Sequence, residues 1–149
     1  MLLTPNFSFE ELTATDWGAF RAMNAAEAES HVDSLRRVAA ELLEPIRAAF
    51  DAPVRIHSGY RCPELNRAVG GSPTSQHQAG QAADFDVVGW EDRRREALDR
   101  IAALPGFKFH QLLIEPGCLH VGLYRPGAPN GEVAFWSAGS KSIITQATA

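Results

Sequence analysis

Apolar residues recur mostly at steps of three and four along residues 32–50, and charged residues lie between them. This spacing is typical of a helix that buries one face, so it predicts a helix over this stretch. Pro45 lies inside it and predicts a kink or a boundary near Glu44, because proline cannot donate the helical hydrogen bond. A second amphipathic pattern predicts a helix over residues 90–104.

Several shorter stretches alternate between apolar and polar residues, as half-buried strands do. They predict strands over residues 54–58, 82–88, 109–115 and 119–123, with a possible edge strand over 132–136. Only Pro116, Gly117 and Cys118 separate the third strand from the fourth, which predicts a hairpin.

The two ends of the chain are less regular. Ser8 and Glu11 have the spacing of a capping box, which predicts a short helix over residues 9–13. Residues 15–30 show no clear period and are expected to form a loop with some helix. The small, polar residues after Ser137 predict a frayed tail.

These elements predict an α+β fold in which helices pack on one side of a small, mainly antiparallel sheet. The 149 residues fit one domain, residues 1–149, with a core over about 6–136. A monomer is expected.

Composition excludes some classes of function. The chain has 14 basic and 18 acidic residues, a net charge of −4, which argues against nucleic acid as a partner. No apolar run is long enough to insert into a membrane, and no secretory signal is visible at the N-terminus. The two cysteines are expected to be reduced thiols.

One group of residues points to chemistry. His77 precedes the strand that carries Asp84, and Gly80 allows a tight turn between them. His120 alternates with apolar neighbours and so faces away from the core, as Asp84 does. Two imidazoles and a carboxylate on one sheet face predict a zinc site with an open position, and Glu115 would be a nearby base. The alternative is a loop histidine and an unrelated surface aspartate.

The stretch SQHQAGQAAD, residues 75–84, resembles the S-x-H-x-x-G-x-A-x-D motif of a zinc peptidase family. That family contains D-alanyl-D-alanine carboxypeptidases and phage endolysin peptidases. EPGCLHVGL, residues 115–123, resembles its second motif. SGYRCPELNRAVGGSPTSQH, residues 58–77, resembles the segment that enters the first motif in the carboxypeptidase branch.

The resemblance implies that one zinc ion per chain is bound by His77, Asp84 and His120. It implies that Glu115 is the catalytic acid and base, that Arg61 holds and polarises the substrate, and that Ser75 contacts it. The implied fold is that of the DD-peptidases and hedgehog signalling domains.

The implied function is hydrolysis of a peptide bond in the peptidoglycan stem or cross-link, in which zinc polarises the carbonyl and binds the attacking water. The partner is then the peptidoglycan stem peptide. Three alternatives stay open for the activity: an endopeptidase, a carboxypeptidase that removes terminal D-alanine, and a zinc-containing binding domain without catalysis. Synthesis in the cytoplasm and action on the cell wall, as in a phage or prophage lysin or a tail-associated enzyme, would reconcile this substrate with the absence of a visible signal.

Three further residues receive interpretations of their own. Asp86 shares the strand face of Asp84 and could orient a ligand histidine, and the alternative is a solvated or turn-bonded acid. Cys118 is expected to lie outside the strand of His120 and away from the site. Arg94 belongs to a run of three arginines that is expected to be a solvated helix face.

Overall fold

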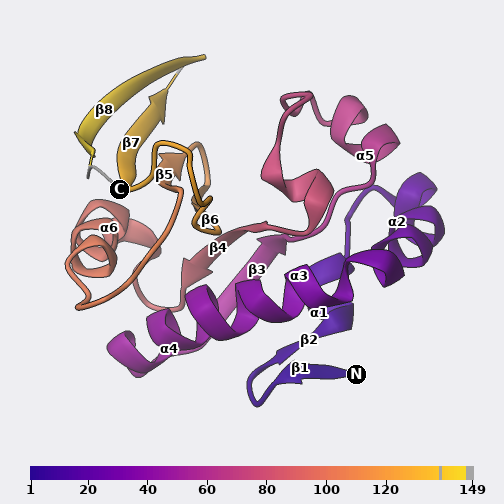
Figure 1. The fold of residues 1–149 in the computed structure, drawn as a ribbon, viewed down its shortest axis with the longest axis horizontal. Helices are drawn as coiled ribbons and strands as arrows, with labels where there is room; N and C mark the ends of the chain where they lie inside the picture. The colour runs from indigo at the N-terminus through magenta and orange to yellow at the C-terminus, as the bar shows by residue number, and fades with distance from the viewer. Residues whose placement is uncertain (138, 147–149) are drawn as a thin grey trace.

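The computed structural model describes residues 1–137 and 139–146. Its strands are β1 Leu2–Thr4, β2 Phe7–Ser8, β3 Val54–Ser58, β4 Ala82–Val87, β5 Gln111–Glu115, β6 Cys118–Gly122, β7 Glu132–Ser137 and β8 Ser140–Gln146. Its α-helices are α1 Phe9–Thr13, α2 Arg21–Ala28, α3 Val32–Arg37, α4 Glu44–Phe50, α5 Pro63–Ala68 and α6 Arg94–Ala102. The predicted α+β class is confirmed (Figure 1).

The six-stranded sheet has the order β3-β4-β6-β5-β7-β8. Every neighbouring pair is antiparallel except β5 and β7, which run parallel. The mainly antiparallel sheet expected from the sequence is therefore confirmed. β7 is an interior strand, however, because β8 pairs along its other side.

The predicted frayed tail is wrong for residues 140–146, which form β8. Gly139 has a φ of +77°, a left-handed conformation that glycine adopts without a steric penalty, and it allows the turn that returns the chain along β7. Lys141 of β8 then pairs with Glu132 of β7 at 2.7 Å. Ile144 packs against the core, so the core extends beyond the predicted residue 136. Residues 147–149 of the predicted tail lie outside the described part of the chain.

The long helix predicted over residues 32–50 is present in three segments: α3, a π-helical stretch over Val38–Leu43, and α4. Helix α4 begins at Glu44 with Pro45 in its first turn, where the missing proline N–H is tolerated. The predicted boundary is therefore confirmed. The boundary is a change in the helical hydrogen-bonding pattern and not a break in the helix. The residues that join the segments all keep right-handed helical backbone angles.

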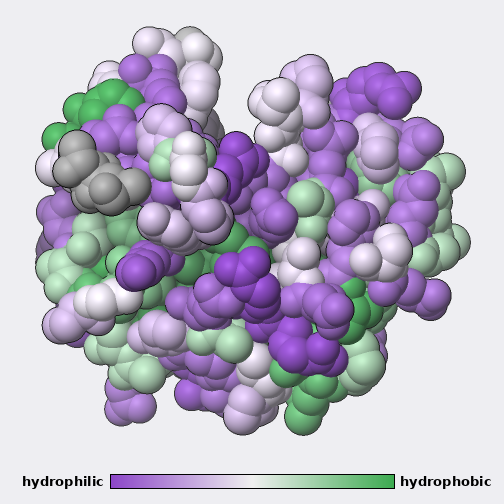
Figure 2. Space-filling model, viewed as in Figure 1, coloured by the Kyte–Doolittle hydropathy of each residue, from purple (hydrophilic) through white to green (hydrophobic). Residues whose placement is uncertain are grey.

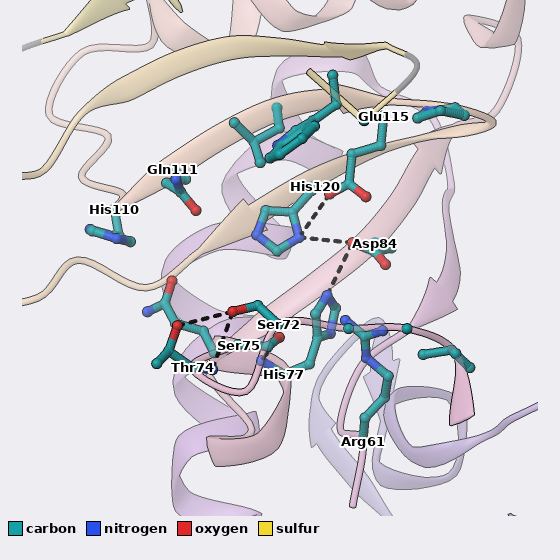
Figure 3. Close-up of a pocket in the computed structure, with 18 of the residues that line it drawn as sticks. Arg61, Ser72, Thr74, Ser75, His77, Asp84, His110, Gln111, Glu115 and His120 are labelled. Atoms are coloured by element: carbon teal, nitrogen blue, oxygen red, sulfur yellow. Dashed lines mark hydrogen bonds and ion pairs between the residues drawn. The ribbon is translucent and has the colours of Figure 1, made fainter. Parts of the chain in front are cut away.

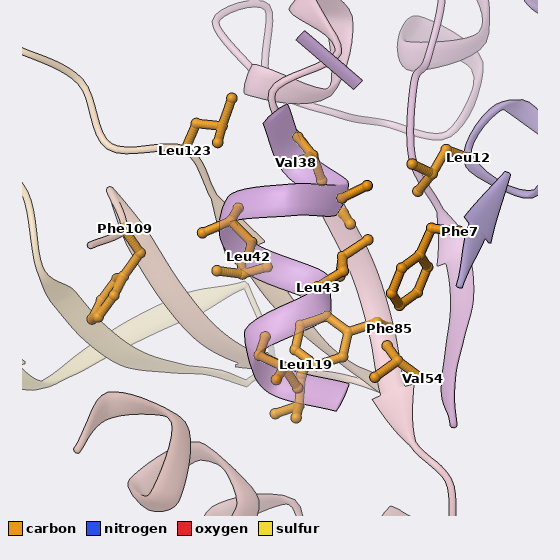
Figure 4. Close-up of a cluster of buried hydrophobic side chains, with 14 of the residues drawn as sticks. Phe7, Leu12, Val38, Leu42, Leu43, Val54, Phe85, Phe109, Leu119 and Leu123 are labelled. Atoms are coloured by element: carbon orange, nitrogen blue, oxygen red, sulfur yellow. The ribbon is translucent and has the colours of Figure 1, made fainter. Parts of the chain in front are cut away.

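The core lies between this long helical segment and one face of the sheet (Figure 4). Leu42, Leu43 and Ile46 are fully buried on the helical side. Phe85 and Leu119 are buried on the sheet side, from β4 and β6. Because side chains alternate along a strand, the residues between them face the opposite side of the sheet. The alternation that places apolar side chains in the core therefore places polar side chains on the opposite face of the sheet.

Residues 15–30 were predicted as a loop with some helix, and the structure places helix α2, Arg21–Ala28, within this stretch. Asn24 and Ala28 are fully buried on this helix. Only two positions of an eight-residue helix are buried, which is too few to produce a clear period in the sequence.

Candidate metal centre

The loop before β4 presents His77 to the polar face of the sheet. The Ser75 hydroxyl accepts a hydrogen bond from the backbone N–H of His77 (3.2 Å) and caps a 3₁₀ turn over Gln76–Ala79. Gly80 ends this turn with a φ of +67°, where a larger residue would be strained. The chain then enters β4, so the turn places His77 beside Asp84.

Strand pairing brings the second histidine to the same place. Asp84 of β4 lies directly opposite His120 of β6. The Gln76 side chain fixes the end of β6, because its Nε2 donates to the carbonyl of Leu123 (3.0 Å). A Cβ at Gly122 would lie 2.1 Å from Oε1 of Gln76, so this contact requires glycine.

Three ligand atoms converge at this point (Figure 3). Nε2 of His77 lies 3.1 Å from Oδ1 of Asp84, and Nδ1 of His120 lies 2.8 Å from the same oxygen. Both histidines are buried, and Asp84 is largely buried. The proximity to the two histidines lowers the pKa of Asp84 far below its usual range, although burial alone would raise it.

The tautomer of His77 tests whether this group fits a metal ion. Its Nδ1 lies 2.7 Å from the carbonyl oxygen of Gly59, which can only accept, so Nδ1 carries the proton. In the neutral ring, Nε2 then directs a lone pair at the Asp84 carboxylate. Two acceptors at 3.1 Å require a proton or a cation between them.

The donor set also suits zinc, which binds imidazole nitrogen and carboxylate oxygen. Ligands at about 2.0–2.1 Å in a tetrahedron lie about 3.3 Å apart. The contacts of 2.8 Å and 3.1 Å are close to this spacing, and the three ligand atoms lie within 4.8 Å of one another. His77, Asp84 and His120 form a candidate metal group, because they could hold a metal ion.

Glu115 ends β5 beside this group. Its Oε1 lies 3.5 Å from Nδ1 of His120. Pro116 and Gly117 form the two-residue turn that follows it, and Gly117 has a φ of +85°. Burial, and then the charge of Asp84, raise the pKa of Glu115. A carboxylate with a raised pKa beside a metal group is suited to accept and return a proton.

Arg61 lies on the other side of Asp84 from Glu115 in Figure 3, and it lines the same cleft. Its backbone N–H donates to the carbonyl of His77 (3.0 Å). Burial lowers the pKa of Arg61, and the charges of Asp84 and Glu115 oppose this effect. Its buried Nε has no hydrogen-bond partner among the described residues.

Asn24 holds the backbone on both sides of Arg61, a role that no pattern in the sequence indicates. Its Nδ2 donates to the carbonyls of Thr13 (2.8 Å) and Tyr60 (3.1 Å). Its Oδ1 accepts from the N–H of Cys62 (2.7 Å). A polar residue within the irregular stretch 15–30 gave no signal of these long-range contacts.

Asp86 does not orient a ligand histidine, contrary to the interpretation from the sequence. Both of its oxygens accept from Arg94 at 2.8 Å, and it contacts His57 at 3.0 Å. Burial alone would raise the pKa of Asp86, but the hydrogen bonds from Arg94 and His57 lower it. Arg94 therefore binds a buried carboxylate and does not belong to a solvated face.

Cys118 was expected to lie outside the strand, and this is wrong. It is the first residue of β6 and pairs directly with Glu115. Its side chain therefore shares the strand face of His120, two residues further on. Its thiol is free and lies within 4.8 Å of ligand atoms of Asp84 and Glu115.

The group lies in a cleft of about 730 Å³. Figure 2 shows a hollow between β7–β8 and the segment that contains α5, lined largely by hydrophilic residues. His110 and Gln111 lie on the opposite side of His120 from Arg61, so residues that line the cleft lie on both sides of the metal group (Figure 3). The lining residues outside the group include Val69, Gly70, Gly71, Ser72, Thr74, Ser75, Leu113, Arg125, Trp136 and Ser137.

Comparison of the sequence with models of known protein families gives a match. The sequence model described as Peptidase M15 matches residues 5–117. The match includes Arg61, Ser75, His77, Asp84 and Glu115, and it ends three residues before His120. No curated protein matched the chain. No helix in the described residues combines the length and apolar character needed to cross a membrane.

Proposed function

The chain belongs to peptidase family M15, and from this membership we propose that it is a zinc-dependent hydrolase of a peptide bond in the peptidoglycan stem or cross-link. The observation that carries the proposal is the convergence of two imidazole nitrogens on one oxygen of Asp84, with Glu115 beside them in an open cleft. His77, Asp84 and His120 would be the zinc ligands, with one zinc ion per chain.

A zinc ion held there would polarise the scissile carbonyl and lower the pKa of a water molecule in its open coordination position. Glu115 would accept the proton of that water and deliver it to the leaving amine. The raised pKa of Glu115 favours the first of these transfers, because the carboxylate of a weaker acid is a stronger base.

Arg61 would stabilise negative charge that develops on the substrate. Its backbone is bound to His77, so its position follows that of the metal group. A guanidinium can hold a carboxylate or an oxyanion through parallel hydrogen bonds. Ser75 lines the cleft, but its hydroxyl already accepts from His77, so substrate contact would use its remaining donor.

The cleft favours an endopeptidase over a carboxypeptidase. Its lining residues lie on both sides of the metal group, Arg61 on one side and His110 and Gln111 on the other, and we infer that a peptide chain extends in both directions. A carboxypeptidase needs room for only one residue after the scissile bond. We therefore propose that internal or cross-link bonds are cut, and that the site of action is the bacterial cell wall.

The test combines metal analysis with product analysis. Purified sacculi are digested with the zinc-loaded protein, and the released fragments are identified by mass spectrometry. Internal stem or cross-link cleavage is expected, whereas release of terminal D-alanine alone would establish the carboxypeptidase. A zinc-loaded protein that releases nothing would favour the non-catalytic binding domain.

Alanine variants of the three ligands test the metal group separately. Each replacement removes one of three donors, so we expect the zinc content measured by elemental analysis to fall by orders of magnitude. Gln78→Ala is a matched control in the same loop, because Gln78 is not among the residues that line the cleft and its side chain donates to the carbonyl of Pro73. Full zinc retention in all three ligand variants would contradict the proposed site.

A further inference from the structure

Cys118 forms a second cluster with two residues of the candidate site. Its sulfur and carboxylate oxygens of Asp84 and Glu115 lie within 4.8 Å of one another. The three residues come from the adjoining strands β4, β5 and β6. Glu115 and Cys118 are direct partners across the hairpin, so the strand register holds them together.

The two carboxylate oxygens of Asp84 allow it to bind one ion together with the histidine pair and a second ion together with Glu115 and Cys118. The contacts of His77 and His120 with Asp84 both go to Oδ1, which leaves Oδ2 for a second ion. Bridging carboxylates allow two metal ions to lie about 3.5–4 Å apart. The cluster is therefore adjacent to the first group and need not displace an ion from it.

The donors of the cluster select for soft divalent ions. A thiolate and two carboxylates give one sulfur and two oxygen ligands, which suit zinc or cadmium and not magnesium or calcium. Asp84, Glu115 and the sulfur would carry formal charges that sum to −3 in the bound state. When the sulfur binds an ion, the thiol proton passes to solvent.

We propose that Asp84, Glu115 and Cys118 form a second, inhibitory site for zinc or cadmium. The inhibitory role rests on the proposed function, because Glu115 cannot accept a proton while its carboxylate binds an ion. Peptidase activity then needs one zinc ion per chain, and excess zinc or cadmium suppresses it.

The test uses the full chain loaded with one zinc ion and titrated with cadmium chloride. Cadmium–thiolate bonds absorb in the ultraviolet, so the absorbance reports sulfur ligation without reference to activity. Inhibition of sacculus digestion by zinc chloride is measured in parallel. Replacing a residue that only hydrogen-bonds to a metal ligand already lowers metal affinity by about 10–100-fold. Replacing a ligand itself should lower the affinity at least as much. We therefore expect Cys118→Ser to abolish the absorbance and to raise the inhibitory zinc concentration at least about tenfold.

Cys62 provides the matched control, because it is the other cysteine of the chain and its side chain is fully buried. Cys62→Ala should keep both the absorbance and the inhibition. A signal that disappears in Cys62→Ala and persists in Cys118→Ser would overturn the proposal, as would an unchanged inhibitory concentration in Cys118→Ser. If the chain digests no peptidoglycan, the absorbance still tests the site. Activity without a cadmium–thiolate signal would refute the second site alone.

Discussion

Replacing Asn24 by alanine should destabilise the protein and displace Arg61. The change leaves three buried backbone groups without their partner: the carbonyls of Thr13 and Tyr60 and the N–H of Cys62. A buried group that loses its hydrogen bond costs about 1–3 kcal/mol. The two carbonyls can relax toward other donors, so the low end of this range applies and the sum is about 3 kcal/mol.

This loss is a large part of the stability of an ordinary domain, which is about 5–15 kcal/mol. It is measured as the change in the free energy of unfolding in urea. Asn6→Ala is the matched control, because Asn6 is an exposed asparagine whose amide bonds to Glu44. Surface substitutions of this kind change stability by about 0.5 kcal/mol or less.

The same variant tests the positioning of Arg61 in the folded enzyme. Asn24→Ala should lower kcat/KM on a stem peptide, and combining it with Arg61→Ala should add little, because both changes remove the same interaction. The reasoning is refuted if Asn24→Ala unfolds within about 0.5 kcal/mol of the wild type. Additive losses of kcat/KM would refute the positioning role alone.

Three further predictions concern residues around the metal group. Glu115→Gln should retain zinc and lose about 10²–10⁴ in turnover, the usual contribution of a positioned base, whereas near-normal turnover would assign the base to another group. If Arg61 serves the oxyanion, amidating the stem peptide should matter little while Arg61→Ala lowers kcat on every substrate; equal and non-additive losses would assign Arg61 to a terminal carboxylate. Asp86 has a folded-state pKa below its unfolded value, so its bonds to Arg94 and His57 stabilise the protein above about pH 4 and cease to do so as the pH falls through the folded-state pKa. Asp86→Asn should therefore reduce the free energy of unfolding more at neutral pH than in acid, and an equal reduction at both would exclude this pairing as the cause.

Local sequence patterns were sufficient to predict the strands β4 and β6, which carry Asp84 and His120. Alternation along β4 and β6 separates Asp84 and His120 from the buried Phe85 and Leu119 because side chains on a strand alternate with a period of two. The capping box at Ser8 and the boundary near Glu44 also depend only on near neighbours.

Contacts between distant segments could not be predicted in the same way. The parallel pairing of β5 with β7 joins strands separated by β6 in sequence, and no local pattern encodes it. The bonds of Asn24 to residues 11 and 36–38 positions away depend on tertiary packing. Arg94 resembled its exposed neighbours in the sequence, yet its partner Asp86 lies on another element.

The cleft separates two tasks within one small chain. Its floor, formed by β4, β5 and β6, holds the groups proposed to bind metal and move protons. Its walls come from two other segments, the stretch from Val69 to Thr74 and the end of β7. Neither wall supplies an atom to the metal group, so both can change in sequence without altering the chemistry below them. A library of variants confined to these walls should therefore yield enzymes that cut different peptides at an unchanged zinc content, which makes this architecture a practical starting point for evolving peptidases of new specificity.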